Sequence, residues 1–283
     1  MRFLASAGVG LLLLLAAPAS AQRALSMEGG ARVAALAGTG AALPGDAWGW
    51  ANPAGPATLG GRAVRFYATQ GFGISELRLG AMRYAEPLGT WGTLSGGARS
   101  FGFDAYRETV FSVGYARGFQ LGTSRSVQAG LAARYYRLSL GNRSGESGAS
   151  YGSAGAFSLS LGALVRLLPR LTLGAAAANV NAARYADGAD LAQTLRVGMA
   201  FRASDRFLVA ADAVKNIDFP LSGRVGVEVV PVKALAVRVG VASAPARFTA
   251  GVGLRLGLLR ARLAFERHRT LGWTPAAGLA AQW

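Results

Sequence analysis

The chain has 283 residues, a formal net charge of +16 at pH 7, 52% hydrophobic residues and only 16% charged residues. Soluble domains usually carry about 25% charged residues, so the composition does not fit an ordinary water-soluble globule. The absence of cysteine excludes disulfide bonds and thiolate metal sites. The basic charge suggests nucleic-acid binding at first sight, but the arginines are scattered singly and the chain carries an export signal, so we expect no nucleic-acid partner.

Residues 1–21 have the pattern of a secretory signal peptide. Arg2 supplies a positive start, a short apolar run follows, and Pro18 leads into the small residues Ala19-Ser20-Ala21. The run is too short for a spanning helix, which needs about 20 apolar residues. We therefore predict export and cleavage after Ala21.

Residues 22–61 show no strand alternation and are rich in Gly, Ala and turn residues. Asn52-Pro53 predicts a turn, since Asn bonds to its own backbone and Pro fixes φ. A segment of this kind cannot bury a core alone. We therefore predict a hatch, or plug, that uses the interior of the following domain as its container.

Residues 62–283 form a series of segments in which apolar and small or polar residues alternate, as in Leu235, Val237, Val239 and Val241. Apolar chains without spanning helices can live in lipid as closed barrels, because the strands satisfy each other's backbone groups. A soluble β-sandwich shows the same alternation, but the many strands of about 10 residues and the Gly/Ala/Ser-rich polar face favour the barrel. The predicted strands are 62–70, 76–86, 90–102, 107–117, 126–140, 151–167, 170–180, 192–202, 206–216, 221–231, 234–243, 247–257, 259–268 and 274–283. The expected fold is all-β: a transmembrane antiparallel β-barrel of about 14 strands with the N-terminal hatch in its lumen.

The connections alternate in length along the chain. Tight links at 168–169, 203–205 and 232–233 alternate with longer ones such as 141–150 and 181–191. Bacterial outer-membrane barrels have short periplasmic turns and longer outer loops. This parity predicts an outer-membrane protein with both termini in the periplasm, bordered by membrane lipid and lipopolysaccharide.

Charged residues fall on the small-residue face of several strands. An Arg facing lipid at mid-depth costs about 2–4 kcal/mol, so we expect these side chains to face the lumen. They form either a network that bonds the hatch to the wall or a path for anions. The set comprises Arg196, Arg202, Asp212, Arg224, Glu228, Arg238, Arg255, Arg262 and Glu266.

No pattern predicts catalysis or a cofactor. Gly148-Ala149-Ser150-Tyr151-Gly152 matches the word of a serine hydrolase elbow, but it lies in a predicted outer loop and not in an α/β sheet. The only histidine, His268, ends a predicted strand. No His/Asp/Glu group has metal-ligand spacing. We expect a protein that is not an enzyme.

The words GARVAALAGTGAAL and GDAWGWANPAGPATL in the hatch, followed by about fourteen strands, resemble the PorV/PorQ family of outer-membrane proteins. That family is similar to the FadL-type transporters of hydrophobic compounds. The resemblance implies a hatch motif at Asp46, Asn52, Pro53, Ala54 and Gly55, which either anchors the hatch or contacts a substrate. The last strand looks like a terminal assembly signal with Leu279 and Trp283.

The sequence leaves three functions open, two of them implied by this resemblance. PorV and PorQ relatives act with type IX secretion, which implies secretion-machinery proteins or exported cargo as partners. FadL-type relatives pass hydrophobic small molecules instead. A porin-like open pore is disfavoured, because a filled lumen blocks free diffusion.

Overall fold

The protein, described from a computed structural model, is defined for residues 29–45, 48–122, 125–141, 150–185 and 188–283. The predicted signal peptide, Asp46 and the first two residues of the serine hydrolase word, Gly148 and Ala149, lie outside these residues. In the described part no helix is long and apolar enough to cross a bilayer.

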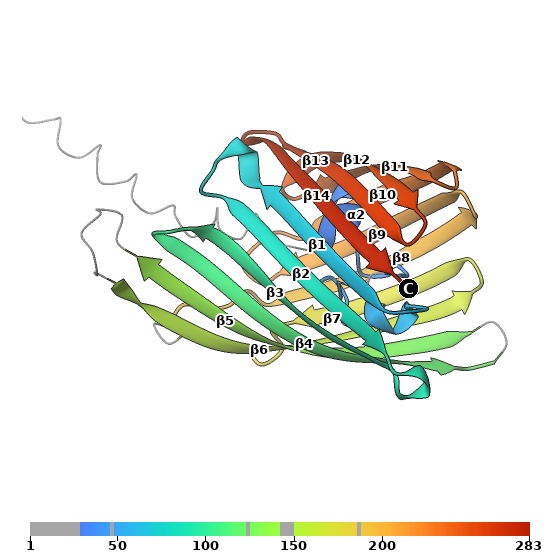
Figure 1. Ribbon diagram of the computed structural model, residues 1–283, viewed down its shortest axis with the longest axis horizontal. Helices are drawn as coiled ribbons and strands as arrows, with labels where there is room; N and C mark the ends of the chain where they lie inside the picture. The colour runs from blue at the N-terminus through green and yellow to red at the C-terminus, as the bar shows by residue number, and fades with distance from the viewer. Residues whose placement is uncertain (1–28, 46–47, 123–124, 142–149, 186–187) are drawn as a thin grey trace, which may run out of the picture.

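Fourteen antiparallel strands in the described residues form one closed barrel, in which each strand pairs with its chain neighbours and β1 closes on β14 (Figure 1). The prediction of a fourteen-stranded barrel is confirmed. The strands are β1 (Ala63–Gln70), β2 (Arg78–Pro87), β3 (Thr93–Phe103), β4 (Tyr106–Gln120), β5 (Ser126–Gly141), β6 (Ser150–Leu168), β7 (Leu171–Ala178), β8 (Thr194–Ser204), β9 (Phe207–Asn216), β10 (Ser222–Val232), β11 (Leu235–Ser243), β12 (Ala246–Leu256), β13 (Leu259–His268) and β14 (Gly272–Gln282).

The alternating side chains face outward and inward as a membrane barrel requires. On β11, Val237, Val239 and Val241 are 40%, 52% and 46% exposed, whereas Arg238 between them is 6% exposed. Exposed Leu, Val and Phe side chains recur on the outer face of every strand from β8 to β14. A sandwich would bury these side chains between two sheets. The exposed apolar belt therefore excludes the sandwich alternative.

Strands β4 to β6 are longer than a bilayer needs. They have 15, 16 and 19 residues, against the roughly 9–11 residues of a tilted spanning strand. They project at the end of the barrel opposite the C-terminus, at the left in Figure 1. This length accounts for the mixed pattern of residues 126–140, because the outer part of β5 extends past the barrel body, and the only shift in its pairing with β6 falls between Leu140 and Gly141.

The alternation of loop lengths is clearer in the second half of the chain than in the first. The turns at 169–170 and 233–234 lie at the C-terminal end of the barrel, and the 179–193 connection lies at the other end. However, the 104–105 turn at that other end is tight, and residues 88–92, which include the short helix η4 (Gly89–Trp91), form a longer link at the C-terminal end. We call the end that holds the C-terminus the C-terminal end and the other the loop end.

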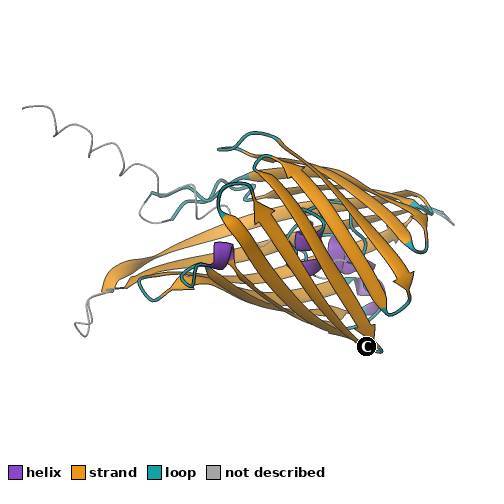
Figure 2. Cartoon of the chain, turned by 90° about the horizontal axis from the view of Figure 1, so that it is seen from above, coloured by secondary structure: helices purple, strands orange, loops and turns teal. Residues whose placement is uncertain are grey.

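The described residues before β1 lie among the strands, where α2 (Gly30–Ala35) and η2 (Gly55–Thr58) appear inside the ring (Figure 2). The short helix η3 (Gly71–Gly73) belongs to the β1–β2 link instead. We call residues 29–62 the N-terminal segment. Val33, Leu36 and Leu43 of this segment are almost completely buried. The barrel core is therefore built from the N-terminal segment and the inward side chains of the wall.

Candidate functional site

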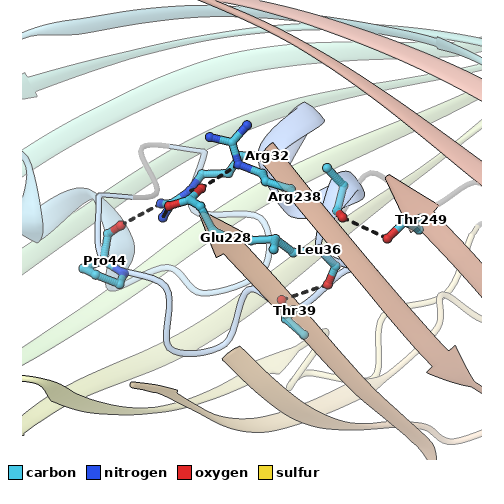
Figure 3. Close-up of polar contacts among 8 residues, drawn as sticks. Arg32, Leu36, Thr39, Pro44, Glu228, Arg238 and Thr249 are labelled. Carbon is cyan, nitrogen blue, oxygen red and sulfur yellow. Dashed lines mark hydrogen bonds and ion pairs between the residues drawn. The ribbon is translucent and has the colours of Figure 1, made fainter. Parts of the chain in front are cut away.

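The N-terminal segment is held to the wall by an arginine–glutamate–arginine cluster. Arg32 of α2 donates two hydrogen bonds to Glu228 of β10, each 2.8 Å long, and a third to the carbonyl of Pro44 at 3.1 Å. Arg238 of β11 donates from Nε to the same carboxylate at 2.5 Å (Figure 3). One wall carboxylate thus binds one arginine of the segment and one of the wall.

The turn after α2 is bonded to the wall through its backbone. Thr249 of β12 accepts a hydrogen bond from the amide of Ala37 and donates one to the carbonyl of Ala35, both at 2.9 Å. Asp212 of β9 accepts from the amides of Gly40 and Ala41 at 2.7 and 2.9 Å. Buried backbone amides need such partners, because no water replaces them. The short helix therefore ends on polar groups supplied by the strands.

Asn52 joins the second half of the segment to two strands. Its amide nitrogen lies 2.6 Å from the carbonyl oxygen of Ala41, 3.0 Å from that of Ala163 and 3.3 Å from that of Ala175. Its side-chain oxygen accepts from the amide of Ala54 at 2.9 Å. Asn52 is 1% exposed, so its polar atoms serve the backbone around it. These contacts are those of an anchoring turn.

Wall glycines make room for this turn. A Cβ on Gly162 of β6 would collide with the side chain of Asn52 and with Pro53, and a Cβ on Gly174 of β7 would collide with the backbone of Ala41. The glycine content of the inward face therefore reflects close approach of the segment to the wall.

The inward cluster of apolar residues is rich in aromatic rings. Its buried members come from the segment and from β1 to β4, β13 and β14; they are Ala31, Ala35, Trp48, Trp50, Tyr67, Leu79, Phe101, Val110, Ala264 and Ala276. Trp48 meets Tyr67 edge to face, with ring centroids 6.3 Å apart. Tyr106 and Tyr136 pack against the cluster from strand positions near the loop end. A buried apolar cluster rich in aromatic rings thus fills this part of the barrel interior, where an open aqueous pore would be polar.

Two arginines lie over Trp50. The guanidinium of Arg134 is 4.6 Å from the ring centroid, and that of Arg99 is 5.1 Å away. Arg99 also forms an ion pair with Glu108 at 2.7 Å. Cation–π contacts of this kind fix the ring by electrostatic attraction. Trp50 is therefore held in place by the wall.

The connection between β7 and β8 contacts Glu108, the ion-pair partner of Arg99. Tyr185 is buried, and its hydroxyl donates to Glu108 at 3.0 Å. Burial raises the pKa of Tyr185 above its ordinary value, and the neighbouring Glu108 carboxylate raises it further. The tyrosine thus stays protonated and able to donate. This loop is thereby joined to the lumen wall.

The nine charged residues predicted to face the lumen divide into three places. Asp212 bonds the segment, and its cross-strand partner Arg224 lies 3.4 Å from the carbonyl of Gly38. Glu266 pairs instead with Arg247 at 3.1 Å near the loop end. Buried Arg196 of β8 lies on the inward face, as Asp212 does. Glu228 and Arg238 form the cluster with Arg32. The remaining three, Arg202, Arg255 and Arg262, lie toward the C-terminal end.

Sequence reasoning did not single out Arg32, Arg99, Arg134 and Glu108. Arg32 carries a signal, as the only charge in the short apolar helix 30–35. Arg134 could have been found from alternation, since Ala132, Arg134 and Tyr136 share the inward face of β5. The partners themselves, up to 196 residues apart, leave no trace in local sequence.

The other predicted positions take simple places. Ala54 and Gly55 are buried at the start of η2, beside Pro53. Leu279 faces outward on β14 and is 62% exposed, and Trp283 donates its backbone amide to the carbonyl of Arg62 at 3.1 Å. His268 accepts hydrogen bonds from two amides of its own turn. Among the described residues no group of three or more His, Cys, Asp or Glu side chains could hold a metal ion.

The fold is shared with outer-membrane channels of known structure. Over 89% of this chain and 96% of the other, it is similar to the Pseudomonas putida toluene transporter TodX, with 16% identity and a TM-score of 0.58. A Pseudomonas aeruginosa FadL homologue matches with 12% identity and a TM-score of 0.60, over 90% and 98% of the two chains. The Acinetobacter baumannii outer membrane protein Omp33 matches with 10% identity and a TM-score of 0.53, over 79% and 98%.

At these identities the likeness shows the fold alone. No protein-family model matches the chain, and no curated protein sequence matches it. The resemblance to PorV/PorQ therefore stays a prediction. The closed barrel and its structural neighbours support an outer-membrane location.

Proposed function

We propose that this protein is a passive outer-membrane channel for small hydrophobic molecules and that the N-terminal segment is its hatch. The observation that carries the proposal is the apolar aromatic cluster inside the barrel, around Trp48, Trp50 and Phe101. Ligand sites for apolar molecules are lined by hydrophobic and aromatic side chains with a few placed polar groups. The polar groups here are Arg99, Arg134 and their partners.

The position of this cluster supports the same function. Leu79 and Phe101 are cross-strand partners near the loop ends of β2 and β3, and both Trp residues belong to the N-terminal segment. A molecule that enters from the loop end meets aromatic surface before it meets the charged cluster around Glu228. Movement of the segment would then open the way past it.

The structural neighbours favour this function over a role in secretion. TodX is a toluene transporter, and the fold agrees over nearly its whole length. None of the three neighbours described above is named as a component of a secretion machine. The role in type IX secretion, with its machinery or cargo partners, stays a hypothesis that rests on the PorV/PorQ resemblance. A stable secretion-complex partner that co-purifies from native membranes would favour it.

A reversible lock on the segment tests the channel proposal. A Cβ added to Gly278 would lie 3.3 Å from the Cβ of Ala31, a few tenths of an ångström short of disulfide geometry. The chain has no other cysteine, so Ala31→Cys/Gly278→Cys joins α2 to β14 by one defined bond. Entry of the apolar fluorophore N-phenylnaphthylamine is measured in proteoliposomes whose outer leaflet holds lipopolysaccharide.

The reduced double variant should admit the fluorophore as the unmodified protein does, and oxidation should slow entry at least tenfold. The single variants Ala31→Cys and Gly278→Cys serve as controls and should not respond to oxidant. Equal entry into empty liposomes and protein-containing liposomes would refute the channel. Unchanged entry after complete oxidation would refute the hatch but leave the channel standing.

A further inference from the structure

A cavity lies at the C-terminal end of the lumen, away from the aromatic cluster. It has a volume of about 620 Å³ and is formed by the ends of β8 to β10 and β12 and by the turns between them. Its basic lining residues are Arg202, Arg206, Lys233 and Arg255, and its acidic ones are Asp205 and Glu228. Six of the twelve residues that line the cavity are therefore charged.

The sheet register adds more positive charge beside this cavity. Arg255 of β12 is the direct cross-strand partner of Arg260 of β13, and Arg262 follows two residues later on the same face, opposite Gly253. Arg262 is repelled by Arg65, Arg32, Arg238 and Arg260. Like charges directly opposite each other destabilise a sheet. Folding alone gives no reason to place these arginines together.

Counter-charges for these residues are lacking within the described chain. The side chains of Arg202, Arg206, Lys233, Arg255, Arg260 and Arg262 make no hydrogen bond or ion pair with any described residue. Glu228, the buried carboxylate of the cavity, is already bonded by Arg32 and Arg238. Asp205 is exposed in a turn. Of the two acidic residues that line the cavity, only Asp205 is therefore not already bonded to other arginines, against six cations.

Inward arginines elsewhere in the barrel have partners within the protein. Arg99 pairs with Glu108 at 2.7 Å, and Arg247 pairs with Glu266 at 3.1 Å. Buried Arg83 and Arg134 donate to serine hydroxyls of the wall instead. The lack of a bonded partner therefore distinguishes the arginines beside this cavity from these four.

We propose that this cavity binds a phosphate-bearing anion. Arginine presents a planar fork that matches phosphate oxygens with two hydrogen bonds. A phosphate monoester carries about 1.5–2 negative charges at neutral pH, so it offsets more of the surplus than a single carboxylate does; a phosphodiester headgroup offers one charge with the same oxygen geometry. The volume accepts a phosphorylated headgroup or a small phosphorylated molecule. This site goes beyond the proposed function and does not depend on it.

The test compares two double variants of the full-length mature protein in a non-ionic detergent. Arg255→Gln/Arg260→Gln removes the opposed pair. Arg137→Gln/Arg269→Gln is the matched control, because both residues are exposed, near the loop end, and make no ion pair in the described structure. Binding of inorganic diphosphate is measured by calorimetry at fixed ionic strength, with acetate as the monovalent comparison. Retention of phosphatidylglycerol from mixed vesicles with phosphatidylcholine is measured by native mass spectrometry.

We expect diphosphate to bind more tightly than acetate and to bind at least tenfold more weakly to the Arg255/Arg260 variant, with the control unchanged. Removal of the repelling pair should also raise the unfolding midpoint of that variant when phosphate is absent, so a failure to fold is separable from a failure to bind. If the Arg255/Arg260 variant alone fails to retain phosphatidylglycerol and the unmodified protein does not bind diphosphate, the phosphate that binds in the cavity is that of a lipid headgroup. Equal binding by both double variants, or no binding of either probe by the unmodified protein, overturns the site. None of these measurements follows apolar transport.

Discussion

The contact between Arg32 and Glu228 should control how often the N-terminal segment leaves the barrel. Arg32→Gln removes the two charge-assisted hydrogen bonds of 2.8 Å that the segment donates to the wall. It leaves Glu228 paired with Arg238, so no carboxylate is left alone inside the wall. The change therefore acts on docking of the segment and spares the barrel.

The size of the effect follows from those two bonds. Hydrogen bonds to charged groups contribute about 1.5–3 kcal/mol each. The side chains of Arg32 and Glu228 are 18% and 11% exposed, so solvent weakens the pair only in part. A loss of about 3 kcal/mol raises the fraction of undocked segment roughly 100-fold, at about 1.4 kcal/mol for each factor of ten.

Planar bilayers report this change as the fraction of time that a single barrel conducts ions. Arg247→Gln is the matched control, because it breaks an ion pair between two strands of the wall, with Glu266 of β13. Both variants should keep the heat-modifiable mobility of a folded barrel. If Arg32→Gln stayed as electrically silent as the unmodified protein, or if Arg247→Gln opened the barrel equally, the docking role of Arg32 would be refuted.

Three further predictions address the segment and the loop. Removal of residues 22–61 should leave a folded but conducting barrel, because the wall closes on itself through β1 and β14, and a silent truncated barrel would show that the lumen is closed by something else. Gly162→Ala should weaken docking of the segment by about 1–3 kcal/mol, since the new Cβ collides with Asn52 and Pro53 and overpacking has that cost. Limited proteolysis should then cleave the segment faster than in the unmodified protein. Gly80→Ala is the control and should be cleaved at the unmodified rate, because a Cβ at Gly80 has nothing within 4 Å. Tyr185→Phe removes the hydrogen bond to Glu108, which at about 1.5 kcal/mol or more should speed amide exchange in residues 183–191 about tenfold; equal exchange in both proteins would mean that other contacts hold the loop.

Most of the barrel could be predicted from the sequence, because membrane strands obey a local rule. Lipid on one side and the lumen on the other force alternation with a period of two, so Val237, Val239 and Val241 faced outward as expected. The even strand count and most strand limits follow from where this alternation stops. The inward direction of Asp212, Glu228 and Arg238 follows from the same rule. Strands β4 to β6 exceed the spanning length, and alternation alone does not limit how far they extend.

The contacts inside the lumen required the tertiary structure. The sequence placed Glu228 and Arg238 on inward faces, but their meeting with Arg32 depends on how α2 sits among strands nearly 200 residues further along the chain. The same holds for Trp50 beneath Arg99 and Arg134, and for Arg255 opposite Arg260, which only strand register decides. Alternation sets the face on which a residue lies, because it is imposed residue by residue by the solvent on each side. Register and docking set its partner, because they depend on the balance of all contacts around the closed ring.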